Sequence, residues 1–590
     1  MDHRRGGLAV TALAMLLMTA CGGDDSANAP PPARPTVTVS GTVSYEFVPP
    51  NGSCTTLNFG ATVTRPIRGA TVQLIDTGTG AQIASMASGA DGSYSFSNVP
   101  RNTSVQLRVR AELKDGGSAG WDVDVRDNFV AGGSDGGVFP PAGLFTRALY
   151  VLDGSSFDTG IIDVTRDLTA TTGWGVNDFS GPRAAAPFAI LDAIYTGMQF
   201  VRSADATRSF PELDVFWSVN NTPSDNIDIT AGEVGTSSYY SGLRMIIVLG
   251  DAAKDIDEFD DHVVLHEWGH YFEDVFSRSD SPGGTHSLGE SLDASLAFSE
   301  GWGTAFAAMA LDDPIYCETR IPGVSGGFGF SIETVSAGVK GWFNELSVMT
   351  LLYDLWDTDN DGSDNGSIGF GPIYNIMTGP QAATEGITTL FSFASELRSS
   401  INAQGVALLD SQLNRENVVS GAALDIWATN ETNFAGVPTI IPRNVAETVL
   451  PLYTDYTADG SVQEVCVDSY LDGLDRHGNN IGEDRYLRIT VPADDQYDVS
   501  VVTTTATPPS ADPNDRDQSD PDIYIIRGAN PSEINEGISP VDNSETYRTP
   551  MMFADETYAA IVEDWRFDDP GASDDYPPRI CFDVSLTPTP

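Results

Sequence analysis

His266-Glu-Trp-Gly-His270 is the stretch on which the central fold depends, and it places two histidines four residues apart. On a helix, residues at this spacing lie on one face, so both imidazoles can reach a single metal ion. Glu267 then lies beside the metal, where its carboxylate can act as a base on an activated water. The chain has only six histidines in 590 residues, and four of them fall between His262 and His286. We therefore interpret the pattern as a zinc site rather than as a helix that happens to bury two histidines.

The segment around this pattern has the periodicity of a helix that is buried on most sides. Its apolar positions are Val264, Leu265, Trp268, Phe272, Val275 and Phe276. We expect the acidic residues 255–261 to supply the N-cap and first-turn carboxylates. Residues 242–250 predict a buried strand that ends at a turn. A strand directly before a metal-binding helix can pair with a substrate along its edge.

A catalytic zinc needs a third protein ligand and one open position for water. Two downstream carboxylates compete for this role. The spacing found in thermolysin-like enzymes favours Glu290, but Glu290 lies in a predicted loop at residues 287–291. Glu300 lies inside a predicted helix at residues 293–310, where a rigid backbone can hold a ligand in place. We favour Glu300.

Three segments in this order resemble the gluzincin metallopeptidases, especially the fungalysin type: His266-Glu-Trp-Gly-His270, Gly283-Gly284 and Ser299-Glu-Gly-Trp-Gly303. The resemblance covers residues 244–309. It implies an α+β zincin-type domain in which His266, His270 and Glu300 bind zinc (Zn2+). It also implies that Glu267 is the general base and proton shuttle of peptide-bond hydrolysis.

The chain departs from this pattern at the residue that orients the first histidine. Thermolysin-like enzymes have an aspartate there, whereas this chain has Thr304, whose hydroxyl is a weaker partner for an imidazole. Asp293 and Glu290 are alternatives for the same role. The substrate-clamping motif Asn-Ala-aromatic-Trp and the exopeptidase motif Gly-x-Met-Glu-Asn are both missing from the sequence, and the second absence makes an endopeptidase the better expectation.

Gluzincins also place a tyrosine or histidine near the oxyanion that forms during hydrolysis, where such a donor stabilises the transition state. Tyr353, on a predicted helix at residues 342–356, is one candidate for this donor. Tyr374 and His286 are the others. The sequence does not rank the three residues.

The composition limits the range of partners. The net charge is −52, from 31 basic and 83 acidic residues. Such a charge excludes nucleic acid as a partner, because the phosphate backbone would be repelled. It suits a protein that functions outside the cell, although it can equally serve solubility alone. A chain of this length is too long for one hydrophobic core, so we expect about three domains.

Residues 1–20 have the form of an export signal, with a positive start, a short apolar run and small residues before Cys21. The segment Met18-Thr-Ala-Cys21 resembles a bacterial lipoprotein box. The resemblance implies cleavage before Cys21 and a lipid anchor on it, so that contact with a membrane occurs only through this lipid. An ordinary signal for secretion is the alternative. Residues 21–35 then predict a disordered tether.

The flanking regions predict sandwiches of β-strands. Short alternating runs at residues 36–115 resemble the carboxypeptidase regulatory-like sandwich, and the Gly-rich residues 116–143 predict a linker or loop. Residues 148–442 form the expected catalytic domain. Asp-rich turns between strands at residues 453–590 resemble the pre-peptidase C-terminal type of sandwich. The expected fold class is therefore multidomain: an α+β zincin-type metallopeptidase domain flanked by two all-β sandwich domains.

Two further features concern cysteines and calcium. Cys466 and Cys581 lie on predicted strands of the C-terminal region, and we expect them to form a disulfide in an exported chain. Cys54 and Cys317 either pair across domains or stay free. Residues 357–362 resemble the start of a calcium (Ca2+) loop, but Ile368 stands where an EF-hand needs a bidentate glutamate. An irregular calcium site and a solvated acidic loop remain the two interpretations.

Together these features predict a zinc-dependent metallopeptidase, an endopeptidase that acts on extracellular proteins or peptides at the cell envelope or after secretion. Two alternatives remain. One is a surface binding or adhesion protein whose zinc site is structural or inactive, and the other is a zinc hydrolase of non-peptide bonds such as esters. Nothing in the sequence indicates the oligomeric state.

Overall fold

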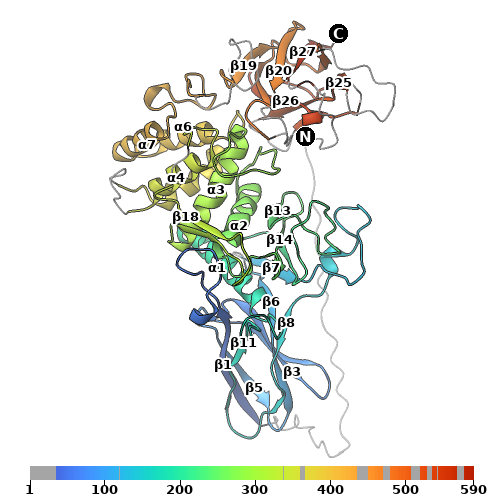
Figure 1. Ribbon diagram of the computed structural model, residues 1–590, viewed down its shortest axis with the longest axis vertical. Coiled ribbons are helices and arrows are strands. Elements are labelled where there is room, and N and C mark those ends of the chain that lie inside the picture. The colour runs from blue at the N-terminus through green and yellow to red at the C-terminus, as the bar shows by residue number, and fades with distance from the viewer. Residues whose placement is uncertain are drawn as a thin grey trace, which may run out of the picture.

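Three parts of the chain follow one another along the long axis of the molecule (Figure 1). A β-sandwich drawn in blue forms one end, the helices occupy the middle, and a second β-sandwich drawn in orange and red forms the other end. The predicted export signal and Cys21 lie outside the described residues, as does all of the predicted tether except Pro35. The computed structural model describes residues 35–117, 120–335, 338–358, 366–434, 449–468, 479–505, 518–527, 534–540, 543–567, 577 and 579–589.

The N-terminal sandwich consists of two sheets, and the strands predicted between residues 36 and 115 all form. In the first sheet β1 pairs with each of the other four strands: β1 (Thr36–Phe47), β2 (Val63–Pro66), β5 (Ser93–Pro100), β10 (Val164–Thr165) and β11 (Leu168–Ala170). The opposing sheet contains β3 (Ala70–Asp76), β4 (Gln82–Ala87), β6 (Ser104–Asp115), β8 (Val151–Asp153) and β9 (Phe157–Asp158). Every second residue of β1 and β6 is buried along most of their length, because side chains alternate between the two faces of a strand.

The second sheet continues into the middle of the molecule. β6 pairs with β7 (Trp121–Arg126), which pairs in parallel with β12 (Leu213–Trp217), and β14 (Met245–Val248) and β13 (Ser238–Tyr240) complete the sheet. The prediction of a linker or loop at residues 116–143 is therefore wrong at β7, whose alternating pattern is short and is surrounded by glycines. Residues 148–170 also differ from expectation, because their four short strands pair with β1 and β6. A boundary at residue 115 or 148 would cut through paired strands.

The position of the sheet edge corrects a second expectation. β14 forms as predicted and is fully buried, but it pairs with β12 on one side and β13 on the other. An internal strand has no free edge for a substrate. β13 is the outermost strand at this end of the sheet, and it is antiparallel to β14.

Helices cover this end of the sheet and pack against one another. They are α1 (Ala186–Ala204), α2 (Asp261–Phe276), α3 (Ala294–Leu311), α4 (Glu345–Trp356), α5 (Phe370–Ile376), α6 (Leu390–Ser400) and α7 (Ala403–Arg415), with a π-helical turn η3 (Met377–Gln381). Aromatic side chains fill the space between α2 and α3, with ring centroids of Phe272 and Trp302 5.2 Å apart. Two small hairpins, β15 (Gly250–Asp251) with β16 (Asp255–Ile256) and β17 (Ile315–Glu318) with β18 (Phe328–Ser331), precede α2 and follow α3 in sequence, respectively.

The expected cap of α2 forms only in part. Asp260 occupies the N-cap position, but its carboxylate makes no capping hydrogen bond. It accepts hydrogen bonds from the backbone N–H and the hydroxyl of Thr319 instead. Asp261 supplies the first-turn carboxylate, as expected. The contact of Asp260 with Thr319 thus takes the place of the expected N-cap hydrogen bond within α2.

The C-terminal sandwich has two sheets and a hydrophobic core of its own. One sheet contains β19 (Tyr453–Thr457), β21 (Arg485–Thr490), β26 (Thr557–Asp564), β23 (Pro521–Arg527) and β24 (Ile534–Gly537). The other contains β20 (Gln463–Asp468), β27 (Arg579–Pro588), β22 (Tyr497–Thr503) and β25 (Ser544–Arg548). The predicted disulfide is confirmed, since Cys466 and Cys581 face each other on β20 and β27 with Cα atoms 4.0 Å apart.

Cys54 and Cys317, whose state the sequence left open, also form a disulfide, with Cα atoms 5.0 Å apart. Most of the predicted calcium loop lies outside the described residues, and Asp357 ends α4 as its C-cap. Among the helices that the structure describes, none combines the length and apolar character that crossing a membrane requires. The chain is multidomain and consists mostly of sandwich-like sheets with a group of helices between them.

Candidate metal centre

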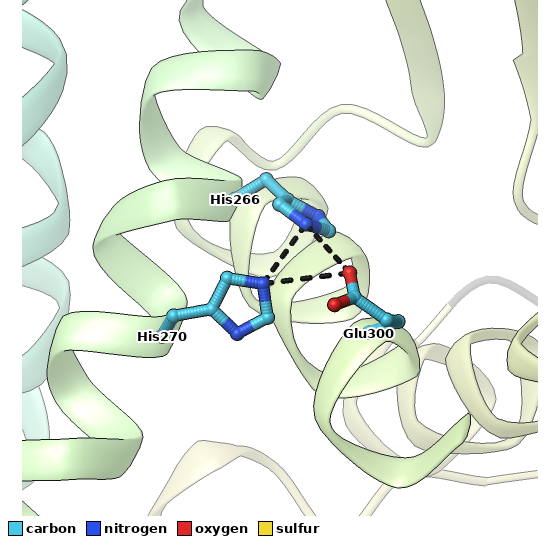
Figure 2. Close-up of side chains that lie close together, drawn as sticks. All are labelled: His266, His270 and Glu300. Carbon is cyan, nitrogen blue, oxygen red and sulfur yellow. Dashed lines mark hydrogen bonds and ion pairs between the residues drawn. The ribbon is translucent and has the colours of Figure 1, made fainter. Parts of the chain in front are cut away.

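Two neighbouring helices bring His266, His270 and Glu300 together (Figure 2). The Nε2 atoms of the two histidines on α2 lie 3.1 Å apart. The Oε2 atom of Glu300, on α3, lies 3.1 Å from the Nε2 atom of His266 and 3.4 Å from that of His270. All three donor atoms therefore point at one common position between the helices.

The spacing of these donors fits a tetrahedral zinc ion. Bonds of about 2.1 Å at tetrahedral angles place neighbouring ligand atoms roughly 3.4 Å apart, close to the three distances above. Two imidazole nitrogens and one carboxylate oxygen are also the donor types that zinc accepts. His286 does not belong to this group of three mutually close donors. The arrangement thus fits a site with three protein ligands and a remaining open position.

Close packing of two glycines allows the helices to approach. A Cβ atom added to Gly269 on α2 would lie 2.9 Å from the Cα atom of Gly303 on α3. A Cβ atom on Gly303 would lie 3.0 Å from the Nδ1 atom of His266. Side chains at either position would push apart the two helices that carry the ligands.

Each histidine contacts a hydroxyl through its other ring nitrogen. The Nδ1 atom of His266 lies 3.0 Å from the hydroxyl oxygen of Thr304, the position where thermolysin-like enzymes have an aspartate. The Nδ1 atom of His270 lies 3.2 Å from the hydroxyl oxygen of Ser299. If the two rings bind a metal through Nε2, each keeps its proton on Nδ1, and both hydroxyls then accept hydrogen bonds that fix the ring orientation.

Ser299 in turn donates to Glu273, at 2.5 Å from its Oε2 atom. Glu273 is 1% exposed, and burial raises the pKa of its carboxyl group to about 7. The sequence analysis missed this residue. Glu273 lies on the same face of α2 as His266 and His270, so helical periodicity was the signal that could have revealed it. Asp293, proposed as an alternative orienting residue, caps α3 instead.

The charges at the centre shift the pKa values of the ligands. Burial acts to lower the pKa of His270, but the carboxylate of Glu300 raises it to about 9. Burial acts to raise the pKa of Glu300, but the histidines around it hold this pKa well below the usual value. The Glu300 carboxyl group is therefore ionised, which is the form in which a carboxylate binds a metal ion.

Glu267, the residue after His266 on α2, contacts the edge of the sheet. Its Oε2 atom accepts a hydrogen bond of 2.6 Å from the backbone N–H of Tyr239 in β13. This N–H is directed away from β14, so the free edge of β13 faces Glu267. Burial is the main cause that raises the pKa of the Glu267 carboxyl group.

Glu290, the competing ligand, is not part of the cluster. Its carboxylate accepts a hydrogen bond from the backbone N–H of Ser287 and closes the loop before α3. His262, at the first turn of α2, lies with its Nε2 atom 3.1 Å from the backbone oxygen of Asp313.

The structure separates the three candidates for the transition-state donor. The Nε2 atom of His286 lies 3.2 Å from Glu300 Oε2 and 3.7 Å from the Oε2 atom of Glu345, a buried residue that the sequence analysis missed. The hydroxyl of Tyr374 accepts from Arg208 and donates to Asp205. The ring of Tyr353 packs against Trp356, and among the described residues no hydrogen bond or ion pair joins either tyrosine to His266, His270 or Glu300. His286 is the candidate beside the centre.

Comparisons with known proteins agree with part of this interpretation. None of the curated proteins compared matches the chain. Among solved structures, the pre-peptidase C-terminal domain of collagenase from Bacillus anthracis is 8% identical, covers 23% of this chain and 94% of its own, and has a TM-score of 0.15. A 9R-lipoxygenase from Cyanothece is also 8% identical, covers 31% of this chain and 25% of its own, and has a TM-score of 0.13. At such scores neither likeness bears on the function.

A family comparison is more informative. Residues 216–408 match the family described as the Mycolysin C-terminal domain. The matched segment runs from β12 into α7 and contains all the residues of the metal centre. The members of this family are peptidases. The match therefore supports the broad conclusion that the protein is a peptidase, which is a hydrolase that acts on proteins.

Proposed function

We propose that the protein is a zinc-dependent endopeptidase with a zincin-type catalytic domain. Zinc would be held by His266, His270 and Glu300. The observation that carries this proposal is the group of three donors at 3.1 to 3.4 Å, with a second carboxylate, that of Glu267, beside His266 on the same helix. The family match over the same residues supports it.

Zinc, when bound at such a site, polarises a carbonyl group and makes a water molecule more acidic. Glu267 would take a proton from the attacking water and pass it to the leaving amine. Its partly hydrophobic surroundings suit this role, because a raised pKa helps the carboxylate to hold the proton between the two transfers. The hydrogen bond from Tyr239 fixes the carboxylate in the required orientation.

His286 is our choice for the group that stabilises the developing oxyanion. Its Nδ1–H donates to the backbone oxygen of Gly284 at 3.3 Å, so Nε2, which faces the metal centre, would act as a donor in the imidazolium form of the ring. A donor aimed at charge that develops only in the transition state contributes to the rate rather than to substrate binding.

The substrate would bind along the free edge of β13. The backbone N–H of Tyr239 already points from this edge towards Glu267, so a peptide in extended conformation there would have its scissile bond near the base. An extended substrate that pairs by backbone contacts suits an endopeptidase of broad sequence preference.

Replacement of the base tests the proposal. Glu267→Gln should keep one zinc ion per chain and lose hydrolysis of casein by roughly 100- to 10,000-fold, because the amide accepts no proton. Zinc content is measured by mass spectrometry of the metal, and hydrolysis by release of soluble peptides with and without a chelator. Full activity in Glu267→Gln would refute the assignment of the base.

The third ligand has a matched pair of variants. Glu300→Gln should weaken zinc binding, because it removes a ligand charge, whereas Glu290→Gln should leave zinc content at one ion per chain. The reverse result would assign the ligand to Glu290. A wild-type protein that binds zinc but cleaves only esters or cell-wall amides would favour the hydrolase of non-peptide bonds.

The cellular place of this activity is also a proposal. The export signal at residues 1–20 and the lipoprotein-type Cys21 would deliver the enzyme to the cell envelope, with a protein or peptide as its substrate. Export is in keeping with the peptidase family. Labelling with a radioactive fatty acid, with Cys21→Ser as the control, distinguishes an anchored from a freely secreted protein.

A further inference from the structure

The C-terminal sandwich contacts the loop that leads into α3. The backbone N–H of Ile481 donates to Ser291 at 3.0 Å, and the backbone N–H of Asp293 donates to Asn479 at 2.8 Å. Tyr486, on β21, donates its hydroxyl hydrogen to the side chain of Asp293, which is the N-cap of α3. The sandwich therefore holds the end of the loop and the start of the ligand helix together.

The side chain of Asn479 extends deeper into the same loop. Its amide nitrogen donates two hydrogen bonds, to the backbone oxygen of Gly283 at 3.1 Å and to that of Thr285 at 2.7 Å. Asn479 is 1% exposed, so no water replaces these bonds if they are lost. The two carbonyls lie on either side of Gly284, and their orientation fixes the peptide units around it.

The position of His286 depends on this part of the loop. The backbone oxygen of Gly284 is the partner of its Nδ1 atom, at 3.3 Å, while its Nε2 atom lies 3.2 Å from Glu300. Gly283 and Gly284 have φ angles of 71° and 92°, a region that favours glycine. The loop has no helix or strand hydrogen bonds here. Within the loop the backbone N–H of Gly283 donates to the hydroxyl of Ser281 at 3.1 Å, and contacts from outside the loop add to this local support.

We propose that Asn479 is a positioning residue of the active site. It orients the carbonyls of Gly283 and Thr285, and through them holds the ring of His286 beside the metal centre. The proposal rests on the proposed peptidase function for the role of His286. It makes the C-terminal sandwich a part of the catalytic apparatus rather than a separate appended module.

The first measurement concerns the loop itself. In the full-length protein, the amide hydrogen of Gly283, which donates to the hydroxyl of Ser281, should exchange at least about tenfold faster in Asn479→Ala, which removes both donors. Asn479→Asp keeps the shape of the side chain but presents only acceptors to the two carbonyls, so it should have the same effect even if alanine impairs folding. The matched control is Asn480→Ala, because among the described residues the hydrogen bond of the Asn480 side chain goes to Glu483 rather than to residues 283–286. Wild-type exchange in both Asn479 variants would overturn the proposal.

The second measurement separates positioning from general damage. With zinc affinity unchanged, kcat on a peptide substrate should fall about tenfold in the Asn479 variants, with KM within about twofold of wild type. In a His286→Ala background the same substitutions should change kcat by no more than about twofold, because the ring that they position is gone. A further tenfold loss in that background would overturn the proposal.

The two measurements also distinguish failure of this inference from failure of the proposed function. A wild-type protein without peptidase activity would refute the proposed function, and the exchange experiment would still decide whether Asn479 holds the loop. Faster exchange without any effect on kcat in an active enzyme would refute the positioning role alone.

Discussion

At the scale of single residues, the proposed metal centre depends on two hydroxyl groups as much as on the three residues proposed as its ligands. The hydroxyl oxygens of Thr304 and Ser299 each lie within hydrogen-bond distance of the Nδ1 atom of a histidine, at 3.0 and 3.2 Å, and both residues are buried. A ligand histidine without such a partner can rotate or bind through the wrong nitrogen. The hydroxyl of Ser299 donates a hydrogen bond to Glu273, so a buried carboxylate also supports the position of His270.

Thr304→Val provides the test at this scale. The substitution keeps the size of the side chain and removes the acceptor for His266, so zinc affinity should fall roughly 10- to 100-fold. Competition with a fluorescent chelator measures this affinity. Thr304→Ser, which keeps the hydroxyl, is the control and should bind zinc like the wild type. Equal affinities in the valine and serine variants would contradict the orienting role.

At the scale of elements, the site results from the approach of α2 and α3. His266 and His270 share one face of α2 because of their spacing, but Glu300 reaches them only because the two helices touch at Gly269 and Gly303. Aromatic rings on both helices fill the remainder of the contact. The distance between the two backbones thus sets the distance between the ligands.

Gly269→Ala should disturb this distance. The new Cβ atom would lie 2.9 Å from a backbone atom of α3, so the helices must separate, at a cost of about 1–3 kcal/mol that exceeds the gain in helix propensity. We expect a lower melting temperature and weaker zinc binding, measured by calorimetry and chelator competition. Gly371→Ala on α5, where a Cβ atom meets nothing within 4 Å, should leave zinc binding unchanged. A stable Gly269→Ala protein with wild-type zinc affinity would show that the contact does not set the site.

At the scale of the whole molecule, the N-terminal sandwich and the helical region share one sheet and one hydrophobic core. β6 and β7 connect the strands of the sandwich to β12 and β14 below α2, and buried residues from both regions form a single cluster. Most of the C-terminal core is a separate cluster. We therefore expect the first two parts to unfold together.

Leu74→Ala tests this cooperativity at a position far from the metal. Leu74 is fully buried in β3, and its truncation should cost about 2–5 kcal/mol. If the core is shared, the temperature at which zinc is released should fall together with the melting temperature of the sandwich. Leu586→Ala, equally buried in β27, is the matched control and should change zinc release less. Loss of the sandwich without earlier zinc release would indicate two independent units.

The sequence by itself determined the local features of this protein. Periodicity within one element reveals the helical spacing of His266 and His270 and the alternating patterns of the strands. The disulfide between Cys466 and Cys581 was expected because the two cysteines lie on two predicted strands. The preference for Glu300 over Glu290 as the residue near the histidines also came from the predicted rigidity of a helix. In the structure Glu300 lies with His266 and His270, in agreement with that preference. The role of Glu300 as a metal ligand is a proposal.

Only the tertiary structure decided which distant groups meet. Four features join segments that are far apart in the chain. They are the edge position of β13, the contact of Tyr239 with Glu267, the pairing of Cys54 with Cys317, and the contact of Asn479 with the loop that carries His286. Periodicity within one segment carries no information about such contacts. They arise from the packing of whole elements, in which burial and hydrogen bonding across the fold override local preferences.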